Sequence, residues 1–199
     1  ITINTMETTK TKILKILFKD IAVKHTITYL AQEVGMSRAG LWKVLKKLEN
    51  ENLILLSSVG AGKTSTYIVN LNWKNSILDK VLSLSLTEDA IKNQRWISNF
   101  SELEDNVGFL IIYGSILHSP KEAKDIDILG VTNNKFIEIE ESIKKIQKTQ
   151  IKKIHSLNFT AKELKEEIRK PNKAFIDAIK KGIVLFGQDN FIKFIKSIK

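Results

Sequence analysis

Asp125 and Asp127 are the residues whose types and spacing point most directly to chemistry. They stand in an otherwise apolar run, Asp125–Val131, which reads DIDILGV. Side chains alternate between the two faces of a β-strand, so both carboxylates point to one face while Ile126 and Ile128 point to the other. Two neighbouring carboxylates repel each other and resist burial, and a divalent cation is the simplest group that compensates them. The pair therefore predicts a metal site.

A second apolar run precedes these acids and must help to position them. Val107–Tyr113 is rich in β-branched and aromatic residues and stops at Gly114-Ser115, which predicts a buried strand that ends in a turn. Nine residues then lead to Asp125, among them Lys124. Two core strands joined by a basic loop are therefore expected to carry the candidate site.

The Gly-Ser turn followed by Asp125-Ile126-Asp127 resembles the signature of nucleotidyltransferases, most closely the minimal ones of the polymerase β superfamily. The resemblance implies a small mixed β-sheet flanked by helices. It also implies Mg²⁺ on Asp125 and Asp127, which would be catalytic, and a nucleoside triphosphate, ATP foremost. Gly114 and Ser115 would hold its phosphates, and Lys124 is either a phosphate neighbour or an ordinary surface lysine.

Physical chemistry agrees with this implied site. Glycine lets the backbone approach a phosphate closely, and free N–H groups at a turn that leads into a helix attract anions. Mg²⁺ typically takes one or two carboxylates together with phosphate oxygens. The implied reaction moves a nucleoside monophosphate onto a protein or a small-molecule acceptor.

The composition indicates a basic globular protein. The 199 residues are 43% hydrophobic and 27% charged, with no run long enough to cross a membrane. The lack of cysteine and of a charged-then-apolar N-terminal layout predicts a cytoplasmic protein without disulfides and without a membrane partner. The net charge of +10 favours nucleic acid or nucleotides as partners. Residues 1–72 are the more densely basic part, with 10 Lys and Arg against 5 Asp and Glu.

The first third of the chain predicts an ordered series of elements from its caps, apolar spacing and turns. In order, these are a helix Thr8–Ile21 capped by Thr8 or Thr9, a short helix Tyr29–Val34 ended by Gly35, a helix from Ser37 to about Asn50, a strand Ile54–Val59, a turn Gly60–Lys63 and a strand Thr64–Leu71.

This order, and the phrase LAQEVGMSRAGLWKVLKKLENENLI within it, resembles the winged helix-turn-helix of bacterial and archaeal regulators. The resemblance implies double-stranded DNA as a partner and a role in transcription regulation, with the helix after Ser37 in the major groove. Lys63 at the hairpin tip would reach a phosphate or the minor groove. The implied DNA-binding residues are Ser37, Arg38, Trp42, Lys43, Lys46 and Lys63.

Trp42 departs from the small polar residue that is usual at its position in this family. It can either stack on a sugar of the DNA or pack against a neighbouring helix, and packing is the preferred interpretation.

The apolar spacing in residues 74–104 predicts a helical connector. Its first helix is Asn75–Leu86, and its second is capped by Thr87 and runs to about Leu103. Regulators of this type often pair through helices beyond the wing, so one prediction is a homodimer. The other is that these helices pack against the C-terminal domain. The predicted class is α+β, with a winged helix-turn-helix domain at 1–73, the connector at 74–104 and a nucleotidyltransferase-like domain at 105–199.

Beyond the two acids, the chain predicts further helices and strands around one sheet. They are a helix Lys135–Lys148, a strand Ile151–Phe159, a helix that begins with a Thr160/Glu163 capping box, a helix Asn172–Lys181, a strand Ile183–Phe186 and a last helix that ends at Lys199.

The strand after the intervening helix lacks a residue that the resemblance would require. Active members of the superfamily usually carry a third carboxylate there, whereas IKKIHSLNF contains no acid. His155, Ser156 and Asn158 are its polar candidates. Asn158 could fill the space of an acid as a neutral oxygen ligand, but an amide cannot accept a proton at neutral pH.

Two hypotheses follow. In the first, the protein is an enzyme that transfers a nucleoside monophosphate and that the winged helix directs to DNA. In the second, it is a transcription regulator whose degenerate transferase domain only senses nucleotide or binds a partner. Release of pyrophosphate separates the two.

Overall fold

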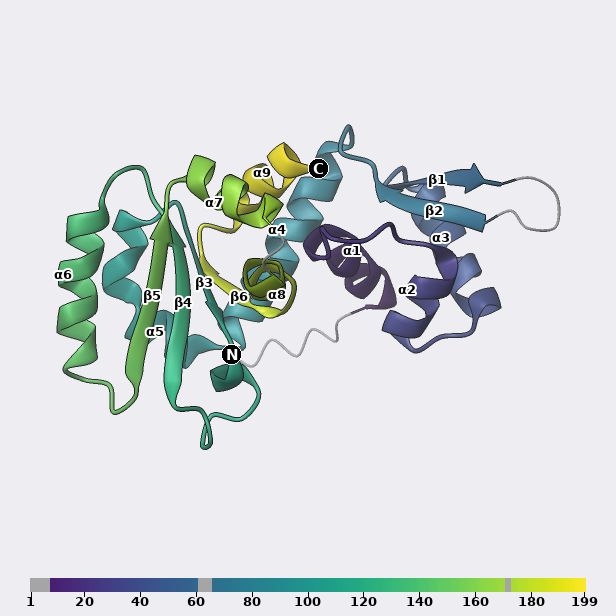
Figure 1. The fold of residues 1–199 in the computed structure, drawn as a ribbon. Coiled ribbons are helices and arrows are strands. Elements are labelled where there is room, and N and C mark those ends of the chain that lie inside the picture. The colour runs from purple at the N-terminus through teal and green to yellow at the C-terminus, as the bar shows by residue number, and fades with distance from the viewer. Residues whose placement is uncertain (1–7, 61–65, 171–172) are drawn as a thin grey trace. The chain divides into compact units, whose positions relative to one another are not determined.

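The computed structural model describes residues 8–60, 66–170 and 173–199. Its elements form two compact units that divide between Leu82 and Ser83, inside helix α4 (Ser76–Ile91). Each unit combines helices with a β-sheet of its own, so the chain belongs to the α+β class (Figure 1). Within the described ranges, no helix is both long and apolar enough to span a membrane.

The first unit contains three helices followed by a two-stranded antiparallel hairpin. The elements are α1 (Thr9–Lys19), α2 (Ile27–Val34), α3 (Arg38–Asn50), β1 (Ile54–Val59) and β2 (Thr66–Leu71). Each helix turns an apolar stripe inward, and the three stripes meet the hairpin in one core. Buried members of this core include Leu14, Leu17, Leu30, Leu41, Leu45, Leu48 and Val69.

The predicted caps of this unit are confirmed. The Thr11 N–H donates to Thr8 Oγ1 at 3.2 Å, and the Gly40 N–H donates to Ser37 Oγ at 3.1 Å. Gly35 closes α2 in the left-handed conformation, with φ of 74°. Because these caps fix where α2 ends and α3 begins, they set the turn between the two helices.

The connector differs from its prediction, since α4 runs without a break through Thr87. The hydroxyl of Thr87 donates to the carbonyl of Ser83 at 2.9 Å, one turn earlier in the same helix, instead of capping a new one. A threonine inside a helix commonly satisfies its hydroxyl in this way. After α4 come α5 (Gln94–Asn99) and the 3₁₀ helix η2 (Ser101–Asn106).

The second unit is built on a mixed four-stranded sheet with the order β5-β4-β3-β6. Its strands are β3 (Phe109–Tyr113), β4 (Asp125–Val131), β5 (Lys153–Phe159) and β6 (Ile183–Phe186). β3 is antiparallel to both of its neighbours, whereas β4 and β5 are parallel and are joined through α6 (Phe136–Gln147). A small mixed sheet flanked by helices was the predicted architecture of this part.

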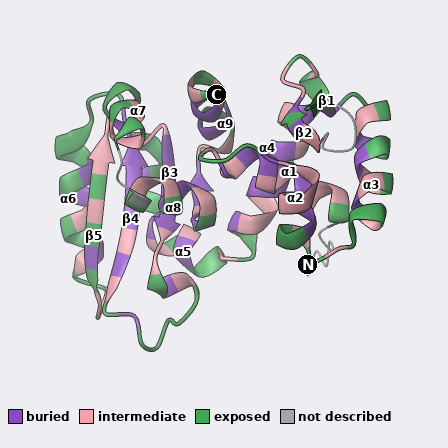
Figure 2. Ribbon diagram, turned by 45° about the vertical axis from the view of Figure 1, so that its right-hand side comes forward, coloured by how far each residue is buried: buried purple, intermediate pink, exposed green. Residues whose placement is uncertain are grey.

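Helices pack on both faces of this sheet. On one face, α5, η2 and α6 bury a cluster with the strands that includes Trp96, Phe100, Leu110, Ile126, Ile128, Ile139 and Ile154. The other face is packed by α7 (Ala161–Arg169), α8 (Lys173–Lys181) and α9 (Gln188–Ile198), through ring pairs such as Phe109–Phe191 and Phe159–Phe175. Figure 2 shows β3 and β4 largely buried, while the edge strand β5 stays partly exposed.

Candidate functional site

The second unit presents Asp125 and Asp127 together on one face of β4. Their side chains are 31% and 25% exposed, whereas the intervening Ile126 and the following Ile128 are buried on the opposite face. Strand alternation therefore places both carboxylates on the same face of the sheet. An apolar strand holds them there, with Ile126 and Ile128 as its anchors in the core.

His155 completes a group of three donor side chains. The parallel pairing of β4 and β5 sets His155 beside Asp127. The Nδ1 atom of His155 lies 3.3 Å from Asp125 Oδ2 and 3.6 Å from Asp127 Oδ1. One donor atom from each of the three residues lies within 4.8 Å of the other two. The adjacent strands β4 and β5 thus bring two carboxylate oxygens and one imidazole nitrogen close together.

Asn158 does not lie beside the two acids, where it could have served as a neutral oxygen ligand. The alternation along β5 puts Ser156 and Asn158 on the face opposite to His155. There, Asn158 Nδ2 donates to Ser156 Oγ at 2.9 Å, and its Oδ1 lies against Gly130. The neutral-ligand idea for Asn158 is therefore wrong. Because side chains alternate along β5, either His155 or the pair Ser156 and Asn158 shares a face with Asp127. The register between β4 and β5 decides which, and it selects His155.

The Gly-Ser turn lies directly against one of the two acids. Gly114 has φ of 84° and ψ of −164°. A Cβ atom on Gly114 would lie 2.4 Å from Asp127 Oδ2, so only glycine leaves this carboxylate its place. The chain continues as a three-residue 3₁₀ helix, η3 (Ser115–Leu117). Ser115 directly follows Gly114, Lys124 directly precedes Asp125, and both are exposed.

The electrostatics of this site favour a cation. Burial, and next the charge of Asp125, raises the pKa of Asp127 above its ordinary value, while His155 opposes the shift. The pKa of Tyr113 is raised by burial and then by Asp127 and Asp125. Negative charge is thus concentrated where solvent screens it only in part, and a bound cation would relieve the repulsion.

The first unit offers a different surface, on the side of α3 that faces away from the core. Leu41, Leu45 and Leu48 are buried and anchor the helix. Arg38 and Lys43 are exposed, and neither forms an ion pair with another residue that the structure describes. Ser37 is exposed as well as being the N-cap. Lys63, the remaining predicted DNA contact of the hairpin tip, lies outside the described residues.

Trp42 packs against the hairpin. Its ring centroid lies 5.0 Å from that of Tyr67 on β2, with the ring planes inclined at 50°. Lys46 Nζ sits 4.8 Å from the Trp42 ring and 2.8 Å from Glu49 Oε2. The packing interpretation therefore holds, but the partner is a strand of the hairpin where a helix was expected. Lys46 has its charge partly matched within α3.

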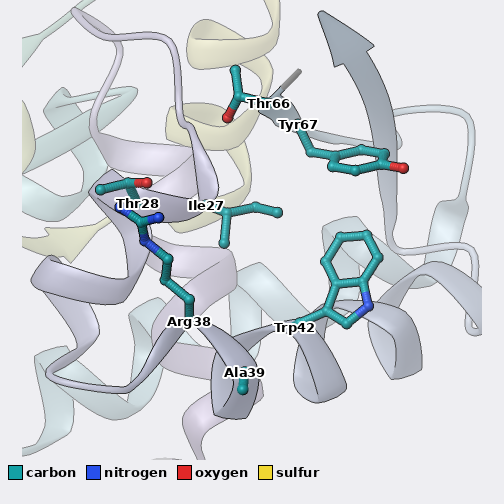
Figure 3. A pocket seen from close by; sticks show the side chains of 7 residues that line it. All are labelled: Ile27, Thr28, Arg38, Ala39, Trp42, Thr66 and Tyr67. Carbon is teal, nitrogen blue, oxygen red and sulfur yellow. The ribbon is translucent and has the colours of Figure 1, made fainter. Parts of the chain in front are cut away.

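A hollow of about 390 Å³ opens beside these residues, between the first turns of α2 and α3 and the start of β2. Figure 3 shows the Arg38 side chain along one side and the rings of Trp42 and Tyr67 at the other. Its lining residues are Ile27, Thr28, Arg38, Ala39, Trp42, Thr66 and Tyr67. One cation, two hydroxyl groups and an aromatic pair make this a surface suited to phosphate and sugar groups.

Residues 6–54 match the family of winged helix-turn-helix DNA-binding domains. The matched range covers α1, α2 and α3 and reaches the first residue of β1. Searches of curated proteins and of solved structures return no match. The N-terminal part of the chain is thus a winged helix-turn-helix domain, in which α2 and α3 form the helix-turn-helix and the β1–β2 hairpin stands in the place of the wing.

Trp42→Ala is expected to lower the free energy of unfolding of this domain by about 1 kcal/mol or more, because the ring contact with Tyr67 is lost. Urea unfolding of the full chain, followed by circular dichroism, measures the effect. Trp42→Phe keeps an aromatic ring on Tyr67 and serves as the matched variant. Unchanged stability together with weaker DNA binding would mean that Trp42 is a DNA contact and not a packing residue.

Proposed function

We propose that this protein binds double-stranded DNA through its winged helix and that its second unit binds a nucleoside triphosphate with a divalent cation. There it transfers the nucleoside monophosphate to an oxygen of a protein or small-molecule acceptor and releases pyrophosphate. One observation carries the second half of this proposal. The Asp127 carboxylate lies between Asp125 and His155 on one side and the Gly114 turn on the other. A cation on the acids would then be next to a backbone that can approach phosphates closely.

The DNA half is supported by the family match and by two exposed cations on α3 that form no ion pair with any residue the structure describes. Arg38 stands in the first turn of that helix, where side chains of this fold reach base edges, and Lys43 follows on the exposed side. The hollow beside Arg38 adds the hydroxyl groups of Thr28, on α2, and Thr66, at the start of β2. We assign Arg38 and Lys43 the strongest contacts, because Lys46 is shared with Glu49.

The donor set fits a divalent cation. Asp125 and Asp127 would supply charge and His155 a third donor atom, all from strands fixed by the core. Such a cation, when bound, would neutralise triphosphate oxygens and activate an acceptor oxygen. Gly114 gives the phosphates room, while Ser115 can donate a hydrogen bond and Lys124 can balance charge. The sequence resemblance suggests Mg²⁺ and ATP for these roles.

A second function is favoured by a specific feature, the absence of an acid on the described strand β5. His155 occupies the position beside Asp127, so no third carboxylate is available there as a base or as a ligand of a second metal. In this alternative, the unit binds nucleotide without turning it over, and the protein is a nucleotide-sensing transcription regulator.

Incubation of the 199-residue chain with labelled ATP and a divalent cation tests both alternatives. Wild type, Asp127→Ala and Asp105→Ala are compared for nucleotide retention and for pyrophosphate release, with exposed Asp105 as the matched control. Pyrophosphate from wild type and Asp105→Ala, but none from Asp127→Ala, supports the transferase. Retention that depends on Asp127 without pyrophosphate supports the regulator. Failure of wild type to retain nucleotide would overturn the proposal for the second unit.

A further inference from the structure

We propose that His155 makes the Asp125–Asp127–His155 site selective for first-row transition ions such as Mn²⁺ and Co²⁺ over Mg²⁺. The inference rests on the metal site of the proposed function, but not on the transfer reaction. Of the three donor residues, Asp125 and Asp127 offer oxygen atoms and His155 alone offers a nitrogen atom.

The geometry supports a shared ion. Donor atoms that occupy neighbouring positions around an ion at about 2.1 Å lie about 3 Å apart. The His155 Nδ1 atom is 3.3 Å from one carboxylate oxygen and 3.6 Å from the other, and one donor atom from each of the three residues lies within 4.8 Å of the other two. Side-chain rotation can therefore bring all three donors onto one ion. The adjacent parallel strands hold the three backbone positions in fixed register.

The chemistry of the donors decides the preferred ion. Mg²⁺ favours oxygen ligands in near-ideal octahedral geometry and usually keeps several waters. Imidazole nitrogen suits the later first-row transition ions, whose affinity for a given site rises from Mn²⁺ toward Cu²⁺. A carboxylate in place of His155 would have added a third negative charge, which strengthens binding of a hard ion. The exchange of oxygen for nitrogen therefore shifts selectivity away from Mg²⁺.

A competing role for His155 is to act as the cation itself. A protonated imidazole at these distances would neutralise the two acids and leave less charge for a metal. This role predicts the opposite response to mutation, because removing the imidazole would then strengthen the binding of every divalent ion. The two roles are therefore distinguished by whether removal of the imidazole lowers or raises the affinity for divalent ions.

Titration calorimetry of the full chain with Mg²⁺, Mn²⁺ and Co²⁺, without nucleotide, tests the inference. Wild type is expected to bind Co²⁺ and Mn²⁺ more tightly than Mg²⁺. His155→Ala should lower Co²⁺ affinity by about tenfold or more and change Mg²⁺ affinity little, while His155→Asp should narrow the gap between the ions. Exposed His118 provides the matched control variant, His118→Ala.

Spectroscopy can show directly whether His155 coordinates the ion, without a measurement of affinity. With ¹⁵N-histidine protein, pulsed electron paramagnetic resonance of bound Mn²⁺ should show one directly coordinated imidazole nitrogen in wild type and His118→Ala and none in His155→Ala.

Each remaining outcome overturns a different claim. Equal selectivity in wild type and His155→Ala, or tighter binding of all ions by His155→Ala, overturns the present inference even if ATP is turned over with Mg²⁺. No ion bound by wild type overturns the metal site as a whole and, with it, the cation-dependent part of the proposed function. Ion selectivity without nucleotide retention upholds the inference and overturns only the nucleotide proposal.

Discussion

Replacing Arg38 and Lys43 together with alanine is expected to weaken binding to duplex DNA by roughly a hundredfold or more. Each side chain is exposed on α3, the helix expected to contact the DNA, and has no ion-pair partner among the described residues. Loss of a base or phosphate contact by such a residue typically costs about 1–3 kcal/mol. A mobility-shift or anisotropy titration across salt concentrations measures both the affinity and its salt dependence.

The salt dependence separates a specific contact from a general effect of charge. Two lost phosphate contacts should reduce the slope of log affinity against log salt by about 2. Lys145→Ala combined with Lys148→Ala removes the same charge from exposed positions near the end of α6. If this control weakens binding as much as the α3 variant, the DNA-facing role of α3 is wrong, and net charge alone explains the attraction.

Gly114→Ala is expected to disable the acidic site and to destabilise the second unit by about 1–3 kcal/mol. The backbone of Gly114, at φ of 84° and ψ of −164°, lies in a region that is essentially restricted to glycine. In addition, the new methyl group would approach Asp127 Oδ2 to 2.4 Å. The carboxylate must then rotate away from its partners, so we expect the affinity for a divalent ion to fall by about tenfold or more.

Gly35→Ala is the matched control for this strain. Gly35 also has positive φ, 74°, but nothing lies within 4 Å of the added Cβ. Its cost should be limited to the left-handed backbone, about 1–2 kcal/mol, with ion binding unchanged. Calorimetry and urea unfolding of both variants make the comparison. Wild-type ion affinity in a folded Gly114→Ala protein would show that the turn does not position Asp127.

Local signals in the sequence were sufficient for much of the fold. The bounds of β4 and β6, the caps Thr8 and Ser37, and the Thr160 capping box were all predicted correctly. Each of these depends on residues within a few positions of one another, so the chain itself contains the information. The three helices followed from the same kind of signal and agree with the family match over residues 6–54. The antiparallel pairing of β1 and β2 after them agrees with the predicted hairpin.

The connector shows why a local cap can mislead. Thr87-Glu88-Asp89 has the residue types of a helix start, yet Leu78, Leu82, Leu86 and Ala90 form a buried stripe that continues across it. Burial of that stripe outweighs the modest preference of Thr87 for a cap, and its hydroxyl is satisfied inside the helix. The apolar spacing, read across the apparent break, was the stronger signal.

The candidate sites required long-range information that the sequence does not contain. Trp42 meets Tyr67 only because the hairpin returns to α3, and nothing near Trp42 in the sequence specifies this partner. His155 faces Asp127 only in one register of β5 against β4, and a shift by one residue would present Ser156 instead. The acids themselves could be found from the sequence, and His155 was one of three polar candidates on the next strand, but only the register shows which of the three faces the acids.

The unbroken α4 has a practical consequence for anyone who wishes to study either half of the protein separately. A fragment cut between Leu82 and Ser83 would end in mid-helix, leaving carbonyl groups without their N–H partners one turn later. Leu86 and Ala90 would be severed from Leu78 and Leu82 on the same apolar stripe. A winged-helix fragment extended to Ile91 keeps the helix whole, but it takes residues 83–91 from the second unit, to which they belong.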